Sequence, residues 1–548
     1  MSLVSALNEL KHLLKSVNQG VNIVDQIDDY LIPRLNRLDA PLLAVLGGST
    51  GAGKSTITNS LIGQVVSEAG VLRPTTRSPL LLCNPDDQAW FTAGGVLPEL
   101  PRSTGARGTG IGLHIVPLAT IPAGLGLIDA PDVDSFEVAN HELAAQLLRA
   151  ADLWLFTTTA ARYADAVPWG FLDQAAQHGV AIAVIINRIP PGETVEVVVE
   201  DFERLLHDHG LGHVTVFAIE EHGLHDGLIT DGVEELKTWM WNLVADEQTR
   251  RQTIGTTLNG VLESLPARVE EVAAHLDRQA DARDRLETIA RNEFEHAADS
   301  VMLQAGRGVA LKTEVIDRFV EHVGTSGWMD QLQRTAGRWR DKLVSLFTRE
   351  DTPEDLAAQE IEGGLSLIVT QTLLDAQDRV QSTWAVDEHA PTLPPIDSDD
   401  LSGRVDAMVA QWRSDLLAMV RQEAQGKVGV ARGLSIGVNA IGVALMLAVF
   451  SYTGGITGGE VAVAGGTAAI GQAMLSAVFG DQAVRSLVKA AAEDLKTRVY
   501  ALANSQGQVA VDALADLPTH NDSARLRSLV EQVAVEHHRE LPRGGNTA

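Results

Sequence analysis

Residues 42–60 read LLAVLGGSTGAGKSTITNS, and this stretch constrains the fold more than any other part of the chain. Five apolar residues, typical of a buried strand, lead into a run that matches the phosphate-binding loop pattern GxxxxGK[ST]. A helical pattern follows, so the loop stands between a strand and a helix, which is the setting that it requires. The sequence therefore predicts an α/β domain with a mostly parallel sheet and a loop that binds a nucleoside triphosphate.

Each residue of this loop has an expected task. Glycines let backbone N–H groups curl around a β-phosphate, which a Cβ atom would obstruct. Lys54 supplies a positive charge to the β- and γ-phosphate oxygens, and Ser55 offers a hydroxyl to Mg²⁺ at the positive end of the following helix. The residues predicted to bind nucleotide here are Gly48, Ser49, Thr50, Gly51, Ala52, Gly53, Lys54, Ser55 and Thr56.

Length, charge and cysteine content narrow the class of protein. A chain of 548 residues is too long for one hydrophobic core. Its net charge of −29 argues against nucleic acid as the main partner and against loose electrostatic adhesion to anionic lipid. The single cysteine, Cys83, excludes an intramolecular disulfide and fits a reducing cytoplasm. The first 39 residues carry charges throughout and show no signal-peptide pattern. We therefore expect a cytoplasmic protein.

The spacing of apolar residues divides the chain into parts. Near the N-terminus they recur three and four apart and predict one amphipathic helix that Pro33 disturbs or ends. Strand-like runs then alternate with helical patterns, at 42–46, 112–117, 124–129, 153–157, 180–187 and 214–219. The predicted parts are a neck helix (1–39), a P-loop GTPase domain (40–245), an all-α bundle or stalk (246–430), a hydrophobic hairpin (431–481) and a return helix with a polar tail (482–548).

Two further motifs fit a magnesium site. Asp129 ends the apolar run LGLI, which suits an acid that holds Mg²⁺ through water. Residues 70–79 read GVLRPTTRSP, where a switch threonine is expected, and Thr76 is the preferred Mg²⁺ ligand with Thr75 as the alternative. Many GTPases have glycine three residues after the acid, whereas this chain has Asp132. The change adds negative charge near the expected γ-phosphate.

The run AIAVIINRIP at 181–190 places Asn187 and Arg188 at the end of a buried strand. GTPases use an Asn/Thr-Lys-x-Asp pattern here, and Arg188 could stack on the base through its planar guanidinium. Pro190 stands where the guanine-reading acid would be. Asn187 and Arg188 are therefore predicted to bind the nucleotide, while the choice between GTP and ATP stays open.

A long uncharged segment lies near the C-terminus. Residues 434–453 contain no charge over the length that a bilayer-spanning helix needs, and residues 461–479 are again uncharged. Lys427 and Arg432 flank one side and Arg485 and Lys489 the other, which suits a membrane hairpin whose two ends face the cytoplasm. The alternative is a pair of buried helices inside a soluble helical domain.

Together these motifs resemble the Era-like and dynamin-like branches of the GTPase superfamily. The run RPTTRSP at 73–79 is similar to the dynamin-type switch, which maps the magnesium-binding threonine onto Thr76, while the loop STGAGKST is similar to the Era type. The run DAPDVDS at 129–135, the Asn-Arg pair and the hydrophobic C-terminal region resemble membrane-associated, dynamin-like GTPases of actinobacteria. The resemblance implies GTP binding and hydrolysis with Mg²⁺.

Catalysis requires an aligned water molecule and a group that neutralises charge on the phosphates. No glutamine follows Asp129 at the position that Ras-like enzymes use. Lys54, Thr76 and Thr50 are the candidate catalytic residues, and Arg73 and Arg77 could act as arginine fingers, in one molecule or across a homodimer of GTPase domains.

Three functions compete at this point. The first is a dynamin-like GTPase that binds or remodels membrane lipid at the inner face of the cell membrane. The second is a soluble Era-type switch that acts on a protein partner and uses the apolar segment as core. The third is a P-loop ATPase, which the missing guanine-reading acid keeps open.

Overall fold

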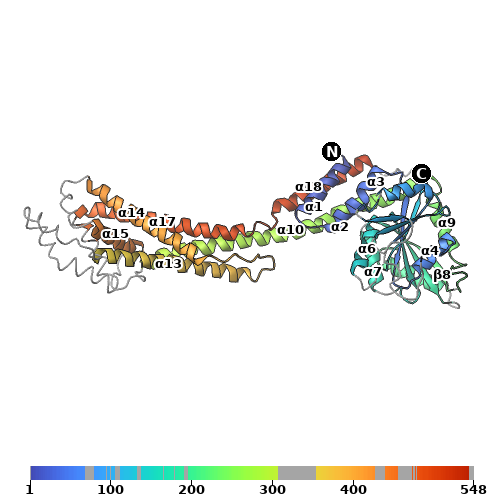
Figure 1. The fold of residues 1–548 in the computed structure, drawn as a ribbon, viewed down its shortest axis with the longest axis horizontal. Coiled ribbons are helices and arrows are strands. Elements are labelled where there is room, and N and C mark those ends of the chain that lie inside the picture. The colour runs from blue at the N-terminus through green and yellow to red at the C-terminus, as the bar shows by residue number, and fades with distance from the viewer. Residues whose placement is uncertain are drawn as a thin grey trace, which may run out of the picture. The chain divides into compact units, whose positions relative to one another are not determined.

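The computed structural model describes most of the chain, as residues 2–67, 79–93, 96–98, 100–104, 112–132, 138–163, 166–177, 179–190, 195–221, 223–306, 353–425, 438–453, 472, 475–476 and 478–541. These residues form two compact units (Figure 1). The first unit takes residues 1–277 and 519–548, and the second takes residues 278–518. The first contains all the β-strands of the described chain, and the second is helical.

An eight-stranded sheet forms the centre of the first unit, with the strand order β3-β4-β2-β5-β1-β6-β7-β8. Among the described pairings only β2 with β5 is antiparallel, so the predicted mostly parallel α/β sheet is confirmed. The strands are β1 (Leu42–Gly48), β2 (Leu80–Cys83), β3 (Arg102–Thr104), β4 (Leu113–Pro117), β5 (Leu125–Asp129), β6 (Leu153–Thr159), β7 (Ala181–Ile189) and β8 (Thr215–Glu220).

The six strands that the sequence predicts are all present, and β2 and β3 are additions that it does not predict. β2 has the short apolar sequence LLLC, and β3 is the polar triplet RST. Neither is long enough to show the alternation by which strands are recognised in a sequence. β3 pairs in parallel with β4, and β2 lies between β4 and β5 and pairs with both.

Helices cover both faces of this sheet (Figure 1). Since successive side chains of a strand point to opposite faces, Leu43 and Val45 of β1 join one apolar cluster, while Leu42 and Leu46 join the other. The first cluster includes residues of α6 (Val138–Ala150), α7 (Ala166–Gln177) and α8 (Val195–Asp208), and the second includes residues of α4 (Lys54–Ile62) and α9 (Glu234–Asn242). Both faces of β1 are therefore buried, as its continuous apolar sequence requires.

The N-terminal segment is broken where the sequence predicts one continuous helix. It forms α1 (Leu3–Ser16), α2 (Val21–Gln26), a π-helical turn (Ile27–Leu31) and α3 (Ile32–Asn36). Asn18 and Gly20 adopt left-handed backbone conformations with φ of 52° and 66°, which end α1. Pro33 does not end the helix but stands just after the π-helical turn, so the helix is distorted beside the proline and continues through α3.

The C-terminal segment of the first unit also differs from the sequence analysis, which expects a polar tail. Residues His520–Glu540 form α18, which lies beside α1 and the first part of α10 (Glu247–Gly306). Leu526, Val530 and Val533 of α18 share one apolar cluster with Leu7 and Leu265 of the other two helices. The apolar face of α1 is thus covered by two helices from distant parts of the sequence.

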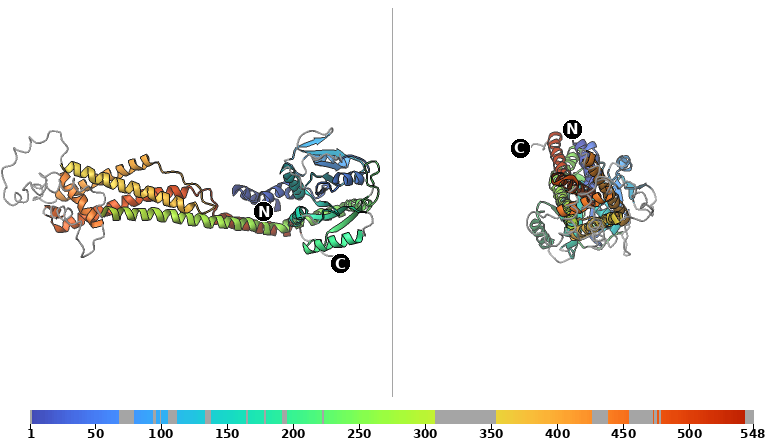
Figure 2. Two further views of the ribbon diagram at one scale, coloured as in Figure 1. Left: turned by 90° about the horizontal axis from the view of Figure 1, so that it is seen from below. Right: turned by 90° about the vertical axis from the view of Figure 1, so that its left-hand side faces the viewer.

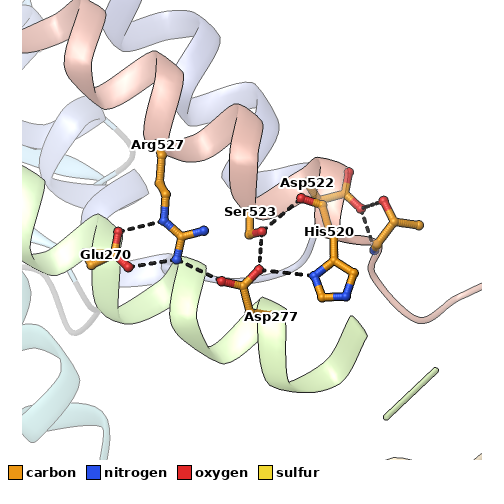
Figure 3. A network of polar contacts seen from close by, with 7 residues as sticks. Glu270, Asp277, His520, Asp522, Ser523 and Arg527 are labelled. Carbon is orange, nitrogen blue, oxygen red and sulfur yellow. Dashed lines mark hydrogen bonds and ion pairs between the residues drawn. The ribbon is translucent and has the colours of Figure 1, made fainter. Parts of the chain in front are cut away.

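Polar contacts hold the start of α18 on α10 (Figure 3). Arg527 donates hydrogen bonds to both carboxylate oxygens of Glu270, at 2.9 and 2.7 Å, and to Asp277 at 2.8 Å. Ser523 donates a further hydrogen bond to Asp277. A capping box between Thr519 and Asp522 satisfies the first backbone N–H groups of α18. The sharp start of this helix is therefore encoded locally.

The second unit is a bundle of long helices (Figure 2). It combines the second half of α10 with α13 (Pro353–Trp384), α14 (Ser398–Gln425), α15 (Val438–Thr453) and α17 (Asp481–Asp512). Trp384 and Trp412 are almost completely buried, and each indole N–H donates to a backbone carbonyl, of Leu286 and Ala491 respectively, at 3.2 Å. Residues 385–397 separate α13 from α14.

Helix α15 carries the described half of the predicted hydrophobic hairpin. Residues 440–450 are all buried, and the helix packs against α13, α14 and α17. Gly442 allows this close packing, because a Cβ atom there would lie 2.6 Å from Cδ2 of Leu417. Searched over its described residues, the structure contains no helix with both the length and the hydropathy of a membrane span. Residues 434–437 and 454–471 lie outside the described residues, and the hairpin stays a prediction.

Candidate functional site

The loop between β1 and α4 has a backbone that only glycine allows at two of its positions. Gly48 has φ of 144°, and a Cβ atom there would overlap the carbonyl oxygen of Thr157 on β6. Gly53 has φ of 91°, and a Cβ atom there would overlap the side-chain amide of Asn187. The glycines of the motif therefore bring the loop onto the neighbouring strands before the chain enters α4.

Lys54 is the first residue of α4, and its side chain folds back beneath the loop. Only 5% of its surface is exposed. The ammonium nitrogen donates to the carbonyl oxygens of Gly48 and Ser49, at 2.9 and 3.1 Å. It also forms an ion pair with the carboxylate of Asp132. A buried positive charge is thus held at the point where the sequence analysis places the phosphates.

Ser55 and Asp129 come together from two elements. The Ser55 hydroxyl, in the first turn of α4, donates to Oδ2 of Asp129 at 2.8 Å, and Asp129 is fully buried at the end of β5. The Ser67 hydroxyl donates to the same oxygen at 2.6 Å. Ser67 is held in turn by Asn59, whose amide oxygen accepts from the Ser67 N–H at 2.8 Å.

The sequence analysis does not identify Ser67 or Asn59. A serine and an asparagine in a polar stretch carry no pattern of their own, and their contact depends on how the chain leaves α4. The two residues fix the position of the Asp129 carboxylate opposite Ser55.

Asn187 lies behind the loop. Its Nδ2 atom donates to the carbonyl oxygen of Ala52 at 2.8 Å, and its Oδ1 atom accepts from the N–H of Arg188 at 2.9 Å. Arg188 itself is exposed and has a left-handed backbone conformation with φ of 56°. The structure therefore brings Asn187 to the loop and leaves the Arg188 side chain at the surface.

Thr50 lies at the top of the loop, and its carbonyl oxygen accepts a hydrogen bond from the guanidinium of Arg162 at 3.1 Å. Arg162 follows β6, and no motif in the sequence indicates a role for it. A cation beside a phosphate-binding loop can be found only once β6 is placed next to β1. Thr76, its alternative Thr75, and the finger candidates Arg73 and Arg77 lie outside the described residues.

The oxygen atoms of Ser55 and Asp129 suit a hard cation that also binds a polyphosphate. One neutral hydroxyl and one carboxylate, from Ser55 and Asp129, supply oxygen atoms of the kind that Mg²⁺ prefers. In the part of the chain that the structure describes, no group of three or more His, Cys, Asp or Glu side chains is arranged to hold a metal ion.

Comparisons with known proteins find similarity to GTPases. No family model matches the chain. It is 24% identical over 179 residues, 33% of its own length, to a probable transmembrane GTPase, FZO-like, of the chloroplast of Arabidopsis thaliana. That match spans only 18% of the relative's own length.

Two solved structures are similar over most of the chain. One is a chain of an oligomerised bacterial dynamin pair described as a mechanism for long-range sensing and tethering of membranes, with 10% identity, coverage of 96% of this chain and 95% of that chain, and a TM-score of 0.42. The other is the LeoA bacterial dynamin GTPase from ETEC, with 11% identity, 97% coverage of both chains and a TM-score of 0.25. These TM-scores are too low to define a shared fold.

Proposed function

We propose that the chain is a magnesium-dependent GTP hydrolase of the dynamin-like kind, with its nucleotide site on the loop between β1 and α4. The observation that carries the proposal is the buried Lys54 ammonium beneath this loop, beside the paired Ser55 and Asp129. The sequence similarity to a GTPase over 179 residues supports GTP as the nucleotide.

The proposed residue roles combine the positions of the described atoms with the sequence motifs. Backbone N–H groups of residues 48–53 would surround the β-phosphate, and Lys54 would contact the β- and γ-phosphate oxygens. Ser55 and Asp129 would hold Mg²⁺, with Thr76 completing the set, and the bound ion would neutralise charge on the phosphate oxygens. Asn187 keeps the loop in place from behind through the Ala52 carbonyl. Thr50 is the remaining catalytic candidate.

The base is the less constrained part of the proposal. Arg188 is exposed at the end of β7, from where its guanidinium can stack on a purine, but Pro190 offers no carboxylate to guanine. The P-loop ATPase therefore stays the competing proposal, and direct competition between the two nucleotides separates them.

Nucleotide titration of the full-length protein tests the site. We expect Mg-GTP to bind, and ATP to displace it less effectively than GTP itself does. Lys54→Ala should lower the affinity for Mg-GTP about a hundredfold, because the charged donor of hydrogen bonds to the phosphates is lost. Lys237→Ala, a change of a lysine on α9 in the same unit, is the matched control and should leave binding unchanged. Equal displacement by ATP would reject guanine specificity, and absence of binding by either nucleotide would reject the site.

For the second unit we propose that the apolar segment of residues 434–479, in which Glu460 is the one charged residue, brings the protein to the inner face of the cell membrane. The lack of charge over 434–453 supports this proposal. The burial of α15 favours the alternative, a soluble switch in which this helix is core. Membrane contact through α15 would therefore require its release from α13, α14 and α17.

Flotation of the full chain with liposomes separates these two functions. We expect the protein to float with lipid when a non-hydrolysable GTP analogue is present and to float less without nucleotide. Flotation in neither state would remove the membrane proposal and leave the soluble switch with a protein partner.

We propose in addition that two GTPase domains pair during turnover. The motivation is that the chain has no glutamine at the position after Asp129 that Ras-like enzymes use, so a group from a second molecule could align the water or neutralise charge on the phosphates. Turnover per molecule should then rise with protein concentration. A rate independent of concentration, with full activity in the monomer, would reject the homodimer.

A further inference from the structure

The ammonium group of Lys54 has three N–H bonds, and the structure uses all three. Two donate to the fixed carbonyl oxygens of Gly48 and Ser49, and the third side of the group faces the carboxylate of Asp132. A phosphate oxygen that binds Lys54 must therefore replace one of these partners.

The carboxylate of Asp132 is the partner that can give way. The Gly48 carbonyl belongs to a backbone that packs against Thr157 of β6 without space for even a Cβ atom. Asp132, in contrast, lies beyond the end of β5, and 26% of its side chain is exposed. Its carboxylate can turn toward solvent without moving a strand or the loop.

We infer that Asp132 sets the affinity of the proposed site by competing with the phosphate chain for Lys54. The inference rests on the proposed function and adds one residue that determines the affinity for the nucleotide. A carboxylate and a phosphate are both anions, so the two cannot share one ammonium without mutual repulsion. Asp132 thereby selects for ligands whose β-phosphate reaches Lys54 and carries enough charge to displace the Asp132 carboxylate.

The effect should depend on the number of phosphates. GTP and GDP both place a β-phosphate at the loop, and both have to displace Asp132. GMP has no β-phosphate and does not reach Lys54. Removal of the Asp132 charge should therefore tighten binding of GTP and GDP and leave GMP unchanged.

Titration of the full chain with GTP, GDP and GMP tests the inference. We expect Asp132→Asn, which keeps the size of the side chain and removes its charge, to lower the Kd of GTP and GDP about tenfold, which corresponds to about 1.4 kcal/mol. Asp132→Ser should do the same, and it provides a second variant if the asparagine variant does not fold. Asp132→Glu keeps the charge and should keep the affinity low.

Asp208→Asn is the matched control, because it removes the same charge from an exposed position on α8 of the first unit. It should leave all three dissociation constants unchanged. Unchanged or weaker binding of GTP by both Asp132→Asn and Asp132→Ser would overturn the inference, and so would an equal gain for GMP. If the wild type binds none of the nucleotides, the proposed function itself fails, which is a different result from failure of the inference alone.

Discussion

Buried charges join the N-terminal segment to the sheet of the first unit. Arg34 of α3 and Asp152, just before β6, are both fully buried and form an ion pair. The same carboxylate accepts a hydrogen bond from the backbone N–H of Leu43 at 2.7 Å, and the Arg34 guanidinium lies over the ring of Trp90 at 5.2 Å. Loss of one partner would leave the other charge buried and unpaired, which is costly in a protein interior. These residues therefore fix α3 against the start of β1.

Asp29 gives the first unit a pH-dependent stability. Burial in the π-helical turn raises its pKa to about 6, although the Gln146 amide donates a hydrogen bond to it at 3.1 Å. Because the pKa is higher in the folded protein than in the unfolded chain, the native state binds the proton more tightly. The free energy of unfolding should then fall as the pH rises from about 4 to about 6.

The variant Asp29→Asn tests this dependence. It removes the buried charge, so the first unit should be more stable than in the wild type by about 2 kcal/mol at pH 7.5, with the gain vanishing near pH 4. Urea unfolding of the first unit at a series of pH values measures the gain in stability at pH 7.5 and its disappearance near pH 4. Asp28→Asn, at a half-buried neighbour paired with Lys11 and Lys15, is the control and should bring no gain at pH 7.5. The same gain at every pH would contradict the assigned cause.

At the scale of elements, the helices of the first unit depend on partners from distant parts of the sequence. α1 alone would expose its apolar stripe to water, and α10 and α18 cover that stripe. α18 is fastened in two ways, by apolar side chains in the shared cluster and by the partly exposed contacts of Arg527. Burial of a leucine contributes more than an ion pair in contact with water.

We expect Leu526→Ala to loosen α18 by about 2–5 kcal/mol and Arg527→Ala by about 1 kcal/mol. Leu526 is fully buried, whereas Arg527 and Glu270 are both partly exposed to water. Hydrogen exchange of the α18 amides measures the local opening free energy in each variant. Arg525→Ala, at an exposed position of the same helix, is the control and should change exchange little. A larger effect of Arg527→Ala than of Leu526→Ala would show that charge, not burial, fastens the helix.

At the scale of the whole molecule, the described residues form two units with separate cores. The sheet with its flanking helices belongs to the first, and the large apolar cluster that includes α15 belongs to the second. α10 contributes residues to both, up to Asp277 in the first unit and from Arg278 in the second. The proposed nucleotide site lies wholly within the first unit.

Calorimetry of the full chain with and without Mg-GTP tests this division. A ligand at a hundred times its Kd stabilises the unit that binds it by about 2.7 kcal/mol. We expect one thermal transition to move upward with nucleotide while a second stays in place, and neither to move in Lys54→Ala. An equal upward shift of both transitions would mean that the two units unfold together, with α10 as the physical link between them.

The sequence alone determines the elements whose signal is local. A strand, a glycine-rich turn and a helix in succession define the loop at 48–55, and the same logic places Asp129 and Asn187 at the ends of buried strands. The helical character of residues 246–306 follows from their periodicity. These predictions succeed because backbone preference and apolar spacing act over a few residues.

Only the tertiary structure decides features that depend on contacts between distant residues. The short strand β3 exists because β4 lies beside it, and β2 because β4 and β5 lie on its two sides. α18 is an ordered helix because α1 and α10 cover it. The contact of Asp132 with Lys54 joins residues 78 positions apart, and no local pattern encodes it. The location of α15 in a protein core likewise depends on its neighbours, because an uncharged helix is equally compatible with lipid and with a packed bundle.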